Sequence, residues 1–194
     1  MIKKLHILKS KLVLLVLMIL ISSVSFSQVT FTANPTDAQI TTALTGTGLT
    51  ISAPVLVSGS RSQQIATFTN GIAGAGLKID KGVMFSTGDV TQNLTNKNSA
   101  PVQNDNLSGN YSDPDLTAIT GAARYNPAVY SFTVTLGLNT TAIRLSYQFA
   151  SEEYPDFVGS GFNDAFGFFV TGPGIAGTAN MARLPTNNKV TTIN

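Results

Sequence analysis

Two stretches in the second half of the chain alternate between apolar and polar side chains. Every second residue is apolar in Tyr130–Leu136 and again in Ala142–Ala150, with Ser, Thr, Arg or Gln between them. A period of two residues is typical of a β-strand that buries one face. About five residues around Gly137 connect the two stretches, so we expect an antiparallel hairpin within one sheet.

Further short runs of β-branched and aromatic residues are separated by Gly, Asn, Ser and Pro. This spacing predicts an all-β domain, a β-sandwich of the jelly-roll or lectin-like kind, rather than a helical or βαβ fold. The further strands that we expect are Gly48–Ser52, Val55–Val57, Gln64–Asn70, Gly82–Ser86 and Ala165–Thr171.

One short helix is expected near the start of this domain. Thr36 and Gln39 have the spacing of a capping box, in which each side chain bonds the other residue's backbone. Ile40 and Leu44 then share one helix face, and Gly46 is placed to end the helix. The predicted fold is therefore all-β with one short N-terminal helix.

Residues Asp89–Thr120 are polar and predict a long surface loop. Loops of this length carry function in many proteins, and others are simply solvated connections. The sequence leaves both interpretations open for this segment.

Residues 1–27 have the pattern of a secretory signal peptide. Four Lys residues precede the apolar run Leu12–Val24, and Ser25 and Ser27 place small side chains before Gln28. The alternative is an uncleaved membrane anchor, but 13 residues fall short of the roughly 20 that a spanning helix needs. We therefore expect cleavage after Ser27, a mature domain of residues 28–194, and a secreted or outer-surface location.

Cysteine is absent from the chain, and its only histidine is His6, inside the predicted signal peptide. The mature domain therefore lacks the residues of Ser-His-Asp and Cys-His nucleophilic catalysis. It also lacks the imidazole and thiolate ligands that zinc and copper prefer. Hard cations with oxygen ligands remain open.

The charge of the mature domain differs in sign from that of the whole chain. Four of the 12 Lys and Arg residues lie in the predicted signal peptide, which leaves eight against ten Asp and Glu, a net charge of −2. Binding to nucleic acid depends on clustered Lys and Arg. No nucleic-acid partner is therefore expected.

Carboxylates gather in one segment, Phe149–Gly174, of a chain with few charges. Pro155 and the turn Gly159–Gly161 fold this segment back on itself, so its acidic groups can converge. The candidate metal-ligating residues are Glu152, Glu153, Asp156, Asn163 and Asp164.

Three interpretations of this acidic segment stay open. Converging carboxylates repel one another unless a cation or protons intervene, and Ca²⁺ takes six to eight oxygen ligands of this type. Alternatively, these side chains cap turns by accepting hydrogen bonds from backbone N–H groups. In the third interpretation, two carboxylates hydrolyse a glycosidic bond, although the chain has no Trp to form a sugar platform.

The same segment closely resembles the choice-of-anchor L domain family. The matching elements are F-A-S-E-E-Y-P at Phe149–Pro155, F-N-D-x-F-G-F-F at Phe162–Phe169 and G-P-G at Gly172–Gly174. An S-T-G element within Gly82–Gly88 and a G-x-G-L-T element at Gly46–Thr50 also match, so that the resemblance covers roughly residues 34–194.

This resemblance implies an exported bacterial surface protein without an established catalytic activity. Many members resemble large adhesin-type proteins of gliding bacteria that are exported through a type IX route, and they carry different C-terminal anchoring or sorting modules. We expect such a module here, but the chain stops at Asn194 without one, so we read it as truncated. The expected function is non-enzymatic binding of a surface glycan or protein; a glycoside hydrolase and a structural spacer are the alternatives.

Overall fold

The computed structural model describes residues 28–93, 107, 112–121, 125–151, 158–161 and 163–192. These residues form small antiparallel sheets and short helices, so the all-β class expected from the sequence is confirmed. The elements of the first half are β1 (Thr30–Ala33), α2 (Asp37–Leu44), β2 (Leu49–Ser58), α3 (Arg61–Gln64), β3 (Ile65–Thr69), α4 (Gly71–Ala75), β4 (Gly82–Phe85) and α5 (Val90–Asn93). Those of the second half are α6 (Pro114–Ile119), β5 (Val129–Leu136), β6 (Ala165–Phe166), β7 (Phe169–Val170), β8 (Ala179–Asn180) and β9 (Thr191–Thr192).

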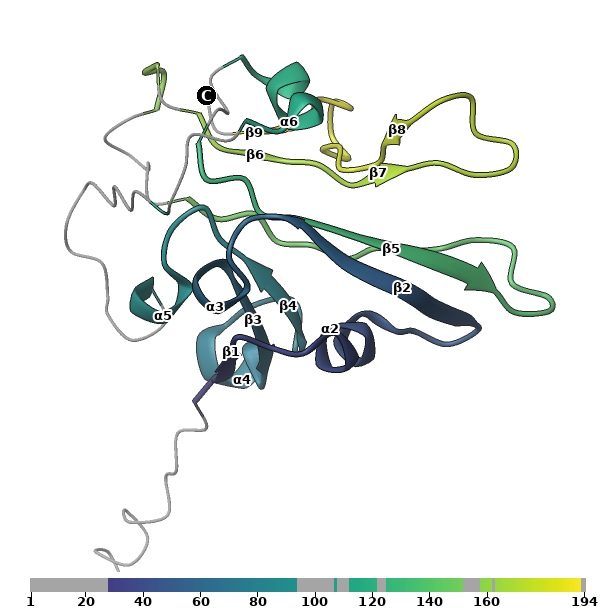
Figure 1. The fold of residues 1–194 in the computed structure, drawn as a ribbon, viewed down its shortest axis with the longest axis horizontal. Coiled ribbons are helices and arrows are strands. Elements are labelled where there is room, and N and C mark those ends of the chain that lie inside the picture. Colours follow the sequence, from purple (N-terminus) through teal and green to yellow (C-terminus); the bar gives the residue numbers. More distant parts are fainter. Residues whose placement is uncertain are drawn as a thin grey trace, which may run out of the picture.

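The sheets lie in layers along the molecule (Figure 1). A three-stranded sheet of order β1-β3-β4 lies on the side of the N-terminal helices, and the long β2–β5 ribbon runs through the middle. The short pairs β6–β9 and β7–β8 lie beyond this ribbon, beside α6. Every strand pair is antiparallel.

Helix α2 begins as its sequence predicts. The Thr36 hydroxyl accepts from Gln39 N at 3.3 Å, and Gln39 Oε1 accepts from Thr36 N at 2.8 Å, which completes the capping box. Ile40 is fully buried beneath this helix. The helix ends at Leu44 with an extended Thr45 cap, so Gly46 is not the residue that ends it.

The two short strands predicted at Gly48–Ser52 and Val55–Val57 form one ten-residue strand, β2. The register shifts between Ser52 and Val55, where Ala53 adopts a left-handed φ of 48°. A bulge of this kind keeps a strand paired while it bends. β2 therefore pairs with β5 along almost its whole length, from Leu49 opposite Leu136 to Ser58 opposite Val129.

The predicted hairpin between Tyr130–Leu136 and Ala142–Ala150 is wrong. The first segment is β5, but its partner is β2, and the second forms no strand. Side chains hold the second segment instead: the Tyr147 ring packs on Phe166 with centroids 4.9 Å apart. The alternation of Ala142–Ala150 predicts one-sided burial, and the structure confirms it near Tyr147, but a segment of this kind need not complete a backbone ladder.

Three smaller expectations also need correction. Four helical segments, α3 to α6, accompany α2, so a single short helix underestimates the helical content. Two of them, α5 and α6, lie within Asp89–Thr120, where Asp113 caps α6 by accepting from Leu116 N at 2.9 Å. The strand expected at Ala165–Thr171 is interrupted at Gly167 and Phe168 into β6 and β7, which pair with different strands.

Candidate functional site

Asp164 lies in the second half of the acidic segment, directly before β6. The Ser151 hydroxyl donates to its Oδ2 at 3.2 Å, across a turn of the chain that includes Gly159 with a φ of 78°. Both side chains are partly buried. The turn thus brings the end of the Thr141–Ser151 segment against the start of β6, as its glycines predicted.

Burial raises the pKa of the Asp164 carboxyl above its ordinary value, and the bond from Ser151 lowers it only in part. Removal from water disfavours the charged form of a carboxyl group unless a cation or several donors compensate it. Among the described residues, the neutral Ser151 hydroxyl is the only group that offsets this loss of water at Asp164. A proton or a bound cation would each supply compensating positive charge.

Two of the five predicted ligands can be placed in the structure. Asn163 and Asp164 are adjacent and both partly buried. Glu152, Glu153 and Asp156 lie outside the described residues. Within the described ranges no group of three or more Asp, Glu, His or Cys side chains could hold a metal ion. The predicted cluster is thus described only at Asp164 and its Asn163 neighbour.

A second polar cluster joins α2, α3 and β5, and no pattern in the sequence predicts it. Arg61 Nη2 lies 2.5 Å from Asp37 Oδ1, and the Tyr130 hydroxyl donates to the same oxygen at 2.8 Å. Arg61 also donates to the carbonyl of Pro35 at 3.0 Å, and its guanidinium lies 5.9 Å from the centre of the Tyr130 ring. The three residues are too far apart in sequence to form a motif.

The charges of this cluster compensate one another. The Tyr130 hydroxyl and Arg61 lower the pKa of Asp37, and Asp37 raises the pKa of Arg61. Burial, followed by the hydrogen bond to Asp37, raises the pKa of Tyr130 to about 12. Each group keeps its ordinary neutral-pH form, so this cluster fixes α2 against β5 and offers no acid or base near pH 7.

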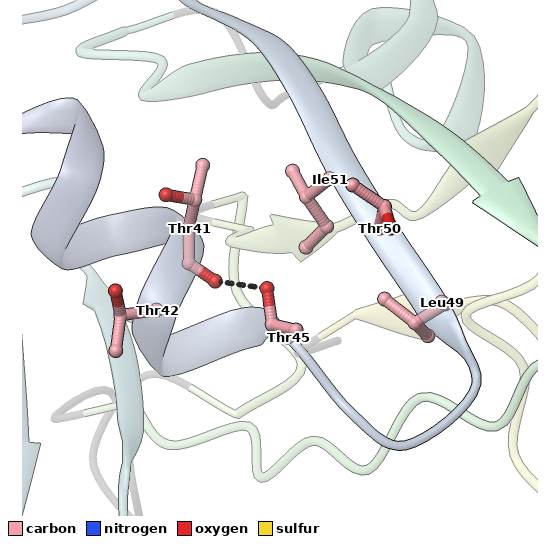
Figure 2. A pocket seen from close by; sticks show the side chains of 6 residues that line it. All are labelled: Thr41, Thr42, Thr45, Leu49, Thr50 and Ile51. Carbon is pink, nitrogen blue, oxygen red and sulfur yellow. Dashed lines mark hydrogen bonds between the residues drawn. The ribbon is translucent and has the colours of Figure 1, made fainter.

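A shallow hollow lies between α2 and β2 (Figure 2). Its walls are Thr41, Thr42, Thr45, Leu49, Thr50 and Ile51, and its volume is about 340 Å³. The three helix threonines donate their hydroxyl protons to backbone carbonyls one turn earlier, as at Thr45 to Thr41 O (2.6 Å). No charged residue lines this hollow, and we assign no chemistry to it.

The model of the choice-of-anchor L domain family matches residues 25–194. The match covers most of the chain, so the chain belongs to this family, as the F-A-S-E-E-Y-P and F-N-D motifs indicated. No curated protein and no solved structure matches the chain. Within the described residues, no helix is long and apolar enough to cross a membrane. Family membership places the chain among surface-associated modules.

Proposed function

We propose that this choice-of-anchor L domain is a non-enzymatic binding or adhesion module of the outer cell surface, assisted by Ca²⁺. Residues 1–27 would be removed as a signal peptide on export through a type IX route. Residues 28–194 would then form a β-sandwich in which the small antiparallel sheets pack face to face. The module would bind a surface glycan or a protein.

The observation that carries this proposal is the partly buried carboxyl of Asp164, which no charged group among the described residues offsets. Its pKa is raised by burial, and the Ser151 hydroxyl is a neutral donor. Three further carboxylates, Glu152, Glu153 and Asp156, precede it in the chain by 8 to 12 positions. A Ca²⁺ ion that is shared by carboxylate, amide and backbone oxygens would neutralise all of them at once.

Thermal unfolding of the secreted chain tests whether the folded protein binds Ca²⁺. A ligand that binds only the folded state raises the melting temperature by mass action, so millimolar Ca²⁺ should raise it relative to chelator. Asp164→Asn should abolish this shift. It should also stabilise the protein in chelator at pH 7, because it removes a partly buried charge that folding disfavours.

Asp115→Asn is the matched control, since Asp115 is an exposed carboxylate in the first turn of α6. This variant should keep the full Ca²⁺ shift. Equal melting temperatures of the unmodified protein in Ca²⁺ and in chelator would refute Ca²⁺ binding. The acidic segment would then be a structural turn. Glycan-array binding with Ca²⁺ and with chelator then identifies the ligand class.

A second candidate function rests on the same pKa. A carboxyl with a raised pKa is what a glycoside hydrolase uses as its general acid, with a second carboxylate as nucleophile or base. In that case Asp164→Asn would abolish hydrolysis of an oligosaccharide panel while leaving binding intact. A panel that is not hydrolysed by the unmodified protein would eliminate this candidate.

A further inference from the structure

Ten consecutive residues, Thr141–Ala150, have a backbone without hydrogen bonds in the described part of the chain. The segment follows the turn at the end of β5 and runs back along the molecule as an irregular trace (Figure 1). Most of its residues are exposed, and two of its apolar side chains, Ile143 and Leu145, are 47% and 37% exposed. Unpaired N–H and C=O groups beside such side chains favour pairing with another strand.

Side chains fix the second half of this segment to the rest of the domain. The Tyr147 hydroxyl lies 2.9 Å from Thr191 Oγ1 on β9, and Gln148 Oε1 accepts from Lys78 N at 2.8 Å. These contacts are made by side chains of the segment, so its backbone N–H and C=O groups take no part in them. The segment is therefore presented as a fixed edge, and it lacks the usual protection: it contains no Pro and a single charge, Arg144.

We propose that Thr141–Ala150 pairs antiparallel with the same segment of a second copy of this chain, about a two-fold axis at Ser146. Most soluble homo-oligomers are closed by such symmetric contacts, in which one patch meets itself. The inference concerns assembly and stands independently of the Ca²⁺ and adhesion proposals.

The sequence of the segment complements itself in this register. Centred on Ser146, the pairs are Leu145 with Tyr147, Ile143 with Phe149, Arg144 with Gln148, and Ala142 with Ala150. Apolar residues then meet apolar residues on one face, where aliphatic and aromatic cross-strand pairs stabilise a sheet. The pairing would also cover the exposed parts of Ile143 and Leu145.

Charge excludes one of the alternative registers. With the axis at Ser146, the only charge of the segment, Arg144, faces the neutral amide of Gln148. Moving the axis to position 144 would place the two guanidinium groups directly opposite each other, which destabilises a sheet. The register at Ser146 also pairs the complete alternating stretch, whereas shifted registers leave residues unpaired at its ends.

Sedimentation of the secreted chain over a range of concentrations tests the pairing. The unmodified protein should form dimers, and Ser146→Lys should weaken dimerisation at least about tenfold, because two lysines would face each other some 5 Å apart. Mixing Ser146→Lys with Ser146→Asp should restore a mixed dimer. Thr133→Lys, an exposed change on β5, should leave dimerisation unchanged.

A cross-link gives a second measurement that tolerates weak association. The chain has no Cys, so Ser146→Cys introduces a single thiol. Directly opposed residues of antiparallel strands have Cα atoms 4.5–5.5 Å apart, within the range that a disulfide bridges. Mild oxidation should convert Ser146→Cys, and not Thr133→Cys, to a covalent dimer. A protein that sediments as a monomer at every concentration, or equal cross-linking of the two variants, would overturn the proposal.

Discussion

The N-terminal region, residues 28–93, and the C-terminal region, residues 141–192, are built in different ways. In its described residues, the first has four fully buried core residues, Ile40, Ile65, Ala66 and Val90, and strands of four to ten residues. Among the residues of the second that the structure describes, Ala182 is the only fully buried apolar one, and the strands are two residues long. Burial of apolar area is the main stabilising contribution to folding, so we expect the N-terminal region to be the more stable of the two.

The buried amide side chains of the two regions also differ, in how completely they are hydrogen-bonded. Gln64, which is 2% exposed, satisfies both ends of its amide: Oε1 accepts from Ser60 N, and Nε2 donates to the carbonyls of Ser86 and Asn126. Asn180 accepts from the N–H groups of Phe168 and Ala182, but its buried Nδ2 has no hydrogen-bond partner in the described part of the chain. The C-terminal region therefore contains two buried or partly buried polar groups, Asn180 Nδ2 and the Asp164 carboxyl, whose loss of water is not fully offset by described partners.

The largest expected effect is at Ile40. Ile40→Ala leaves a cavity beneath α2 and should lower the free energy of unfolding by about 3 kcal/mol. Ile175→Ala, the same change at a 37% exposed position in the C-terminal region, should cost about 0.5 kcal/mol. Denaturant unfolding measures both values. Equal losses would contradict the difference in burial between the two regions.

An intermediate effect is expected at the two buried amides. Gln64→Leu leaves one backbone donor and two carbonyls unpaired and should cost about 2 kcal/mol. Asn180→Leu should cost less, about 1 kcal/mol, because it also removes a donor that already lacks a partner. The same denaturant titration compares the pair, and a larger loss at Asn180 would reverse the comparison.

The smallest effect is a pH dependence in the N-terminal region. The pKa of Tyr130 is about 12 in the folded protein and about 10 in an unfolded chain, so the folded state retains its proton longer. Its contribution to stability is therefore complete below pH 10 and is lost as the pH rises toward 12. Tyr130→Phe should remove this part of the alkaline decline, measured by urea unfolding between pH 8 and 12. Parallel pH profiles of the two proteins would contradict it.

Local patterns predicted the elements that local physics determines. The capping box at Thr36, the strand at β5 and the turn around Gly159 depend on neighbours in sequence, and the sequence was sufficient for them. Strand partners were not predictable in this way. β5 pairs with β2, some 80 positions earlier, and no local pattern in the sequence specifies a partner at that distance. Tyr130, Asp37 and Arg61 meet only after that pairing forms.

The candidate site was predicted in part for the same reason. Concentrated carboxylates identify the acidic segment, and the structure brings Asp164 to Ser151. That the pKa of Asp164 is raised could not be read from the sequence, because it depends on how far folding buries the carboxyl. The remaining ligand assignments, at Glu152, Glu153 and Asp156, stay predictions, as does the glycan or protein partner.

Hydrogen exchange of the secreted chain with and without millimolar Ca²⁺ tests the central claim most directly. If a cation completes the acidic segment, Ca²⁺ should slow exchange in peptides that cover residues 149–170 and leave residues 28–93 unchanged. Asp164→Asn should remove this protection. Identical exchange of the acidic segment in Ca²⁺ and in chelator would contradict the claim that this segment is a cation-assisted binding element.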